Sequence, residues 1–167
     1  MEDMELIQQS TTPLYLTPEG YKSLQAELEH LTLSKRAEIA ERLRDSKMHG
    51  EFSEDNSELD EVKFEQAIVE NRIAELKQLF SQAMILDPET IPKDMVSIGS
   101  YATIKDAERN IEFEIRMVSS FEANPDEDLI SNESPLGIAL IGRKVGDEVV
   151  FEAPAGKLKY KITKIRK

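Results

Sequence analysis

Apolar residues recur at spacings of three and four along the first half of the chain, which is the period of one face of a helix. The first stripe consists of Tyr21, Leu24, Leu28, Leu31, Ile39 and Leu43, with a more polar interval between Leu31 and Ile39. Just before it, Thr17 offers an N-cap hydroxyl and Pro18 takes the tolerated first position of a helix. The pattern predicts a helix from Thr17 to about Lys47.

A second stripe has the cleaner heptad spacing of a coiled-coil seam: Leu59, Val62, Gln66, Val69, Ile73, Leu76, Phe80 and Ala83. Its one polar member is Gln66. Gly50 and the acidic, turn-prone residues 51–58 separate the two stripes. Two helices of about 30 residues can bury these stripes against each other, which predicts an antiparallel hairpin about 45 Å long at about 1.5 Å per residue. An ordinary helical bundle is the alternative, but the remaining sequence offers strands instead of further long helices.

The second half of the chain alternates between short apolar runs and turn residues. Asp87-Pro88 and Ile91-Pro92 indicate a linker. Residues 96–104, 111–118, 148–153 and 158–165 are expected to form two hairpins of a twisted antiparallel sheet. Between them, residues 134–142 have a capping Ser, a Pro and a terminal Gly, which predicts a short helix packed on the sheet. The fold class is therefore α+β, with a coiled-coil hairpin over residues 13–86 and a globular domain over residues 93–167.

Charge narrows the set of partners. The net charge is −12, and residues 1–86 hold 18 acids and 9 bases while residues 87–167 hold 15 acids and 12 bases. Such a chain repels phosphates, so we expect no binding to free DNA. The sequence contains no cysteine, no metal-ligand spacing around its two histidines and no apolar run long enough to span a membrane. We expect a monomeric cytoplasmic protein.

The loop between the two expected helices is the most acidic segment of the chain. Between Gly50 and Val62 stand six acids and no base: Glu51, Glu54, Asp55, Glu58, Asp60 and Glu61. Like charges crowded at the tip of a hairpin indicate a cationic partner, although a solvated run of charge is an equally ordinary interpretation. Composition alone leaves both open.

Residues 47–58 read Lys-Met-His-Gly-Glu-Phe-Ser-Glu-Asp-Asn-Ser-Glu, and residues 128–136 and 140–147 form a second recognisable segment. The first resembles the hairpin tip, H/F-G-D-L-x-E-N-x-E-Y, of the GreA/GreB family of transcript-cleavage factors. The second is similar to the C-terminal signature of that family. The resemblance covers about residues 13–165 and leans toward GreA, because bases near the tip are sparse.

The resemblance implies a function. In this family the hairpin enters the secondary channel of RNA polymerase, and tip carboxylates help to hydrolyse the 3′ end of backtracked nascent RNA, while a domain with a fold similar to FK506-binding proteins docks the factor. The polymerase supplies the catalytic site, so the factor itself is not an enzyme. It further implies that Glu51 and Glu54 hold a Mg²⁺ ion shared with the polymerase and not bound by the free protein, and that Lys47 and Lys63 form a basic patch facing the RNA.

The tip loop departs from the family pattern at the residues that would hold the metal ion. Between Gly50 and Asn56 stand five residues where the family has four. If Asp55 is the extra residue, Glu51 and Glu54 take the two metal-linked positions; if the insertion lies earlier, Asp55 takes the second. A shift of about 1 Å can cost on the order of a hundredfold in rate. A channel inhibitor without cleavage activity is therefore the alternative function.

A prolyl isomerase or chaperone built on the second domain is a more distant alternative. It needs an aromatic-lined pocket, and the aromatic residues there are expected in the core: Tyr101, Phe113, Phe121, Phe151 and Tyr160. Two groups of bases stay unassigned. Lys35, Arg36, Arg42 and Arg44 either line the RNA-facing side or balance neighbouring acids, and the six bases of residues 157–167 protect a strand edge or form a binding surface.

Overall fold

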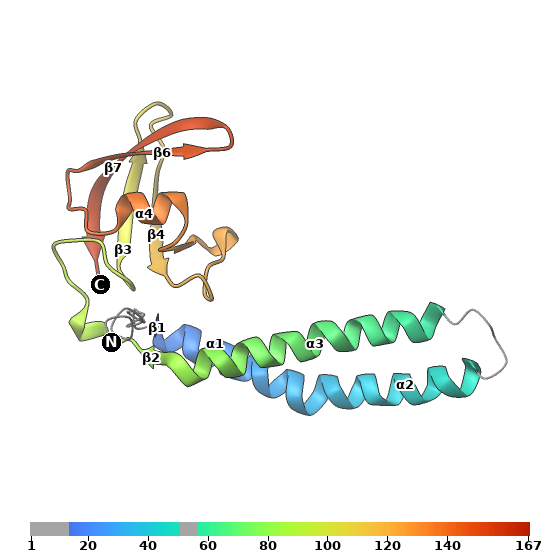
Figure 1. Cartoon of the computed structure of the whole chain (residues 1–167). Helices are drawn as coiled ribbons and strands as arrows, with labels where there is room; N and C mark the ends of the chain where they lie inside the picture. The colour runs from blue at the N-terminus through green and yellow to red at the C-terminus, as the bar shows by residue number, and fades with distance from the viewer. Residues whose placement is uncertain (1–13, 51–56) are drawn as a thin grey trace, which may run out of the picture. The chain divides into compact units, whose positions relative to one another are not determined.

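The computed structural model describes residues 14–50 and 57–167, which divide into two compact units (Figure 1). One unit is Tyr21–Ala83, and the other combines residues 14–20 with Met84–Lys167. The start of the expected hairpin and the expected linker thus belong to the same unit as the C-terminal sheet. In the described residues, no helix is long and apolar enough to cross a membrane.

The helical unit consists of two long helical arms. The first arm runs without a break through α1 (Pro18–His30), the π-helical segment η1 (Leu31–Lys35) and α2 (Arg36–Gly50), and the second arm is α3 (Ser57–Gln82). The predicted N-cap is confirmed, because the amide of Gly20 donates to Oγ1 of Thr17 at 3.0 Å.

The π-helical segment lies where the first apolar stripe weakens. The spacing from Leu31 to Ile39 is one residue longer than a three-four heptad step. A π turn holds more residues than an α turn and absorbs such an insertion, so the stripe returns to the same face at Ile39, which is only 2% exposed. Within the segment, Oγ1 of Thr32 donates to the carbonyl of Leu28 at 2.8 Å. That bond satisfies a carbonyl at the point where the helical pattern changes.

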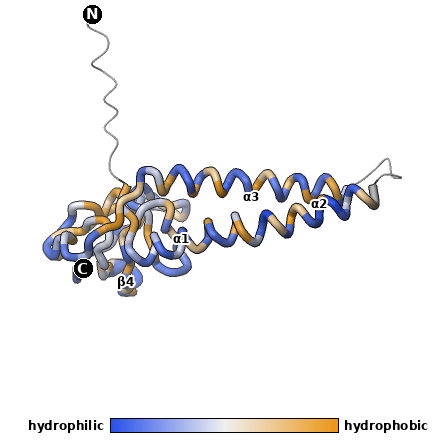
Figure 2. The backbone as a smooth tube through the Cα atoms, turned by 90° about the horizontal axis from the view of Figure 1, so that it is seen from below, coloured by the Kyte–Doolittle hydropathy of each residue, from blue (hydrophilic) through white to orange (hydrophobic). Residues whose placement is uncertain are grey.

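The two arms bury the predicted seam against each other, with Ile39, Val62, Val69 and Ile73 at its centre and Leu28, Leu31 and Leu43 packed around them. Figure 2 shows these arms as mostly hydrophilic helices on which apolar residues recur at intervals. At two places along α3, the residue before the predicted seam position is the more buried one. Gln66 is exposed, while Glu65 is half-buried and pairs with the opposite arm. Near the base, Leu79 is buried at 2% exposure, and Phe80 lies edge-on to Tyr21 with ring centroids 5.1 Å apart.

The second unit is built on a five-stranded sheet of order β5-β4-β3-β7-β6. Its strands are β3 (Tyr101–Asp106), β4 (Glu112–Val118), β5 (Leu129–Ser131), β6 (Glu148–Ala153) and β7 (Gly156–Arg166). Both predicted hairpins, β3-β4 and β6-β7, are confirmed as antiparallel pairs. Strand β5, which the sequence pattern did not reveal, runs parallel to β4.

Strand β3 starts later than predicted. The apolar run from Val96 is interrupted by a turn in which the amide of Ser100 donates to the carbonyl of Ser97 at 3.0 Å and Gly99 has φ of +88°. Val96 is nevertheless 1% exposed, because its side chain packs in the core of the domain, while its backbone bonds Gly142 and Arg143 instead of a strand neighbour.

A short helix, α4 (Pro135–Leu140), covers one face of the sheet (Figure 1). As predicted, Oγ of Ser134 caps it by accepting from the amide of Gly137 at 3.1 Å. Gly137 allows a close approach, since a Cβ there would overlap the carbonyl of Ser131. The core below α4 consists of Val96, Ala102, Ile104, Ile115, Met117, Leu140, Val149 and Ile162.

The segment joining the two halves is ordered against the second unit. Strands β1 (Leu14–Leu16) and β2 (Ala83–Ile85) form a two-stranded sheet, and the turn η2 (Pro88–Thr90) is capped by Asp87, which accepts from the amide of Glu89 at 3.0 Å. Leu86 and Ile91 are buried on either side of this turn. A second short turn, η3 (Pro125–Glu127), precedes β5.

Candidate functional site

The acidic tip connects the ends of the two arms. Glu51, Glu54 and Asp55 lie outside the described residues, between the end of α2 at Gly50 and the start of α3 at Ser57. The described acids next to them, Glu58, Asp60 and Glu61, are exposed at the start of α3. Negative charge at a helix N-terminus is stabilised by the helix dipole, so part of the acidic run also supports α3.

Below the tip, ion pairs hold the two arms together. Glu65 of α3 accepts from Nζ of Lys35 at 3.0 Å and from Nη1 of Arg42 at 2.6 Å. These two hydrogen bonds, Lys35 first, hold the pKa of the Glu65 carboxyl below its usual range. Farther down, Arg36 forms a two-pronged pair with Glu70, at 2.8 Å for each bond. Three of the four unassigned bases of the first arm therefore balance acids of α3.

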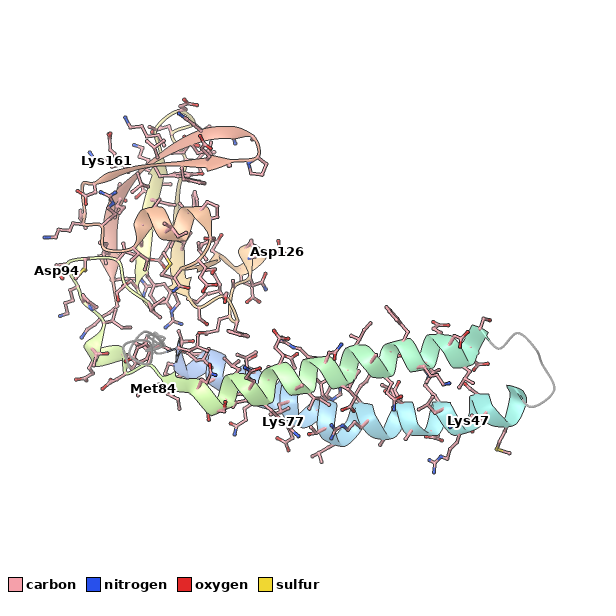
Figure 3. The ribbon with its side chains drawn as sticks, viewed as in Figure 1. Lys47, Lys77, Met84, Asp94, Asp126 and Lys161 are labelled. Atoms are coloured by element: carbon pink, nitrogen blue, oxygen red, sulfur yellow. The ribbon has the colours of Figure 1, made fainter. Side chains whose placement is uncertain are left out.

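The bases nearest the tip are different. Lys47 and Lys63, expected to form the RNA-facing patch, are exposed on the two arms, and Figure 3 shows Lys47 near the end of α2. Neither of them, nor Arg44, forms a salt bridge with any described residue, in contrast to Lys35, Arg36 and Arg42. An unpaired ammonium close to the tip is free to meet an anion from outside.

The fit of Mg²⁺ to the tip rests on donor chemistry. Among the described residues, no group of three or more acids or histidines is arranged to hold a metal ion. The tip carboxylates belong to the class of hard oxygen donors that Mg²⁺ accepts, typically one or two at a time with waters completing the shell. The donor set therefore suits an ion that a second molecule also coordinates.

The second unit exposes an apolar hollow that sequence reasoning missed. It has a volume of about 430 Å³ and is lined by Met95, Val96, Ser97, Ile98, Asn132, Ile138, Ile141 and Gly142. Ile138, within the short helix α4, is 67% exposed, and Ile141, which follows the helix, is 40% exposed. The signal was available in the sequence: a six-residue helix has room to bury one face only, yet this helix is apolar throughout.

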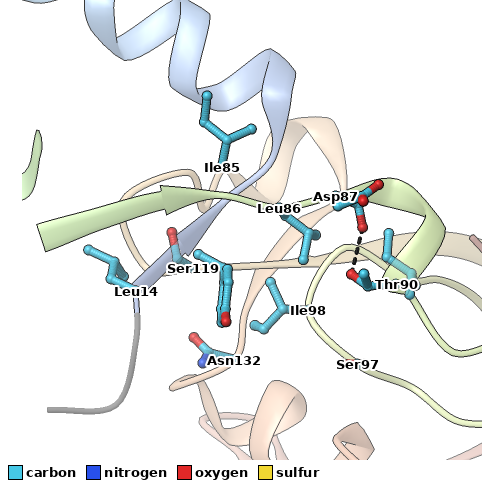
Figure 4. Close-up of a pocket in the computed structure, with 11 residues that line it drawn as sticks. Leu14, Ile85, Leu86, Asp87, Thr90, Ser97, Ile98, Ser119 and Asn132 are labelled. Carbon is cyan, nitrogen blue, oxygen red and sulfur yellow. Dashed lines mark hydrogen bonds between the residues drawn. The ribbon is translucent and has the colours of Figure 1, made fainter.

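A second cavity, of about 530 Å³, lies between the β1-β2 pair and the residues that follow β2 (Figure 4). Its lining mixes aliphatic residues, with Leu14, Leu86 and Ile98 among them, and polar residues, namely Asp87, Thr90, Ser97, Ser119 and Asn132. Ser119 is 3% exposed, and its Oγ has no hydrogen-bond partner among the described residues.

Neither cavity has the aromatic lining that a prolyl-isomerase site requires. Tyr160 stacks on Phe151 with ring centroids 5.6 Å apart and meets Phe113 edge-on at 5.8 Å. Tyr101 lies under the guanidinium groups of Arg116 and Arg166. These four aromatic side chains are thus engaged in the packing of the domain, which disfavours the isomerase interpretation.

Two family descriptions match the chain, "Transcription elongation factor, N-terminal" over residues 14–85 and "Transcription elongation factor, GreA/GreB, C-term" over residues 91–167. Among similar proteins, the transcription elongation factor GreA of Thermoanaerobacter pseudethanolicus is 49% identical over 155 residues, which cover 93% of this chain and 98% of that protein. The GreA of Acetivibrio thermocellus is 48% identical over 152 residues, with coverages of 91% and 95%. Among solved structures, GreA factor homolog 1 (Gfh1) of Thermus thermophilus is 30% identical, covers 92% of this chain and 99% of that one, and has a TM-score of 0.43. Both halves of the sequence match in order, and the chain belongs to the GreA/GreB family of transcription elongation factors.

Proposed function

We propose that the protein binds RNA polymerase through its secondary channel and stimulates endonucleolytic cleavage of the 3′ end of backtracked nascent RNA, which rescues arrested complexes. The observation that carries this proposal is the family match across both halves, joined to a two-armed hairpin whose connecting loop is acidic. The longer single helix, α3, has 26 residues and spans about 39 Å at about 1.5 Å per residue. Such a thin probe suits a channel.

In this proposal the protein is an accessory factor, and the polymerase supplies the catalytic site. Glu51 and Glu54 supply carboxylate oxygens to a Mg²⁺ ion in the polymerase active site, with Asp55 replacing Glu54 if the insertion lies earlier in the loop. The ion, when bound, provides the Lewis acidity that activates a water for attack on the phosphodiester. The carboxylates also orient that water and accept its proton.

The two lysines just behind the tip have a separate role. Lys47 and Lys63 contact phosphates of the extruded RNA and hold its 3′ segment near the tip. Neither lysine forms a salt bridge with a described residue, and this supports the role, because an ammonium already paired with a carboxylate would gain less from a phosphate. The protein acts as a monomer in the cytoplasm and does not bind free duplex DNA, in keeping with its net charge of −12.

Docking on the polymerase is assigned to the apolar hollow beside α4. An isoleucine exposed by 67% contributes little to folding, and burying it against a partner removes apolar surface from water. We expect Ile138→Ala to leave stability within about 0.5 kcal/mol of the parent and to weaken polymerase binding by about tenfold. Ile111→Ala is the matched control, since Ile111 is 53% exposed in the β3-β4 turn. Equal affinity of the two variants would exclude the hollow as the docking site.

The decisive experiment is cleavage of a backtracked elongation complex with and without the protein at several Mg²⁺ concentrations. The parent is expected to shorten the RNA from its 3′ end. Glu51→Gln and Glu54→Gln should each reduce the rate on the order of a hundredfold, because an amide is a weaker Mg²⁺ ligand and accepts no proton. Glu41→Gln, at an exposed acid of α2 away from the tip, is the control and should cleave like the parent.

Asp55→Asn then locates the inserted residue. A small effect assigns the insertion to Asp55, and a loss as large as that of Glu54→Gln transfers the metal-linked role to Asp55. If the parent binds the complex but does not shorten the RNA, the protein is a secondary-channel inhibitor and the cleavage proposal is wrong.

A further inference from the structure

The face of the five-stranded sheet opposite α4 is unusually basic for this protein. The strand register places the side chains of alternate residues on this face, which we call the basic sheet face. It carries seven bases: Lys105, Arg116, Lys157, Lys159, Lys161, Lys164 and Arg166. It carries four acids: Glu112, Glu114, Glu148 and Glu152. The other residues of the segment 84–167 include five bases and eleven acids. Charge is thus segregated within one domain.

Strand β7, which carries five of these seven bases, is an interior strand of the sheet. It lies between β3 and β6, so the expectation that its lysines protect a sheet edge is wrong. Residues spaced by two along a strand lie about 6.6 to 6.8 Å apart, and Lys157, Lys159 and Lys161 follow this spacing. Figure 3 labels Lys161 on this strand.

Most of the acids on the basic sheet face are already engaged. Glu148 pairs with Lys159 at 2.9 Å, Glu114 forms a two-pronged pair with Arg166 at 2.7 and 2.9 Å, and Glu112 accepts from Thr163 at 2.9 Å. Lys105, Lys161 and Lys164 form no salt bridge with a described residue. Lys105 and Lys161 are also direct cross-strand neighbours, an arrangement that is unfavourable between like charges.

The chemistry of the face favours a protein partner over a nucleic acid. Four carboxylates lie among the bases, so the face carries both signs and complements a protein surface better than a uniformly negative phosphate backbone. Single-stranded nucleic acids also need free aromatic rings for stacking. Tyr101, the aromatic residue of this face, is covered by the guanidinium groups of Arg166 at 3.9 Å and Arg116 at 4.7 Å.

We propose that the basic sheet face binds a predominantly acidic protein surface of the transcription elongation complex, centred on Lys105, Lys161 and Lys164. This contact rests on the proposed function and is distinct from the docking hollow, which lies on the α4 side of the sheet. It adds electrostatic attraction to the apolar docking and orients the domain on the polymerase.

The test compares three full-length proteins for their affinity to a backtracked elongation complex at several salt concentrations. The test variant is Lys105→Gln/Lys161→Gln/Lys164→Gln, and the matched control is Lys93→Gln/Arg109→Gln/Lys144→Gln, which removes the same charge from exposed positions elsewhere. We expect the test variant to bind about tenfold more weakly at low ionic strength and within about twofold of the parent near 0.5 M salt, where screening removes the attraction. The control should bind within about twofold of the parent throughout.

Cleavage by saturating protein is measured in the same samples. Full cleavage by all three proteins, with the affinity difference described, supports the inference. Equal affinity of the parent and the test variant, or equal weakening by the control, overturns it while leaving the proposed function intact. Direct binding of bare DNA or RNA by the parent that the test variant loses also overturns it, because the partner would then be a nucleic acid. Failure of the saturated parent to cleave contradicts the proposed function instead.

Discussion

The seam that joins the two arms carries the main prediction on stability. Ile39 is 2% exposed and packs against Val62, Val69 and Ile73 of α3. Ile39→Ala removes three carbon groups, worth about 0.8 kcal/mol each in transfer free energy, or about 2.4 kcal/mol together. A cavity between two arms with few further neighbours collapses only in part, so we expect a total loss of about 3 kcal/mol.

This loss should appear in the helical unit alone. Each kcal/mol shifts the melting temperature of a domain of about 60 to 100 residues by about 4 to 8 °C, so the helical transition should fall by about 12 to 24 °C. Circular dichroism at 222 nm, which is dominated by the helices, follows that transition. Because two units need not unfold together, the signal of the sheet domain is measured separately by the exchange of its strand amides.

The control is Leu33→Ala, which removes a side chain of the same size from the same helical arm. Leu33 is 68% exposed, so its truncation should change stability by less than about 0.5 kcal/mol. If Ile39→Ala melts within about 3 °C of the parent, or if Leu33→Ala is equally destabilising, the apolar seam around Ile39 does not hold the arms together.

Three further predictions concern the caps and ion pairs. Gly20→Ala should destabilise the protein by about 1 to 3 kcal/mol in chemical unfolding, because the new Cβ would overlap the Glu122 carboxylate that accepts from Thr17. Adding Glu122→Ala to this variant should recover part of the loss. The parent should be more stable than Glu65→Gln, and this advantage should be fully present above the ordinary pKa of a glutamate, about 4.3. It should disappear as the pH falls through the lowered pKa of Glu65 in the folded protein. Equal advantages at pH 7 and pH 2 would contradict the pairing of Glu65 with Lys35 and Arg42. Ser134→Ala should cost about 1 kcal/mol and accelerate hydrogen exchange at the Gly137 amide, and unchanged exchange there would show that the cap does not hold α4.

Local patterns were sufficient for much of the fold. The Thr17 and Ser134 caps and the linker prolines depend on a few neighbouring residues, so they can be found in the sequence. The heptad stripes predicted the pairing of the arms, because a helix must bury an apolar face and only a second long stripe was present. The acidic tip and its similarity to the family motif could likewise be found in the sequence, and they support the proposed function.

Long-range packing decided the remainder. The sequence determined that the first stripe weakens after Leu31, but the π turn follows from keeping both ends of that stripe against α3. Heptad counting assigned Gln66 to the seam, whereas the position of Glu65 follows from Lys35 and Arg42 on the opposite arm. The basic run of residues 157–167 was compatible with a strand edge or a binding surface. Its place between β3 and β6 was set by pairing with β3, whose residues lie 54 to 65 positions earlier in the chain. Helix caps and apolar periodicity depend on residues close together in the sequence, so they can be predicted from short segments. Strand order and the ion pairs between the arms depend on residues that meet only after the chain has folded.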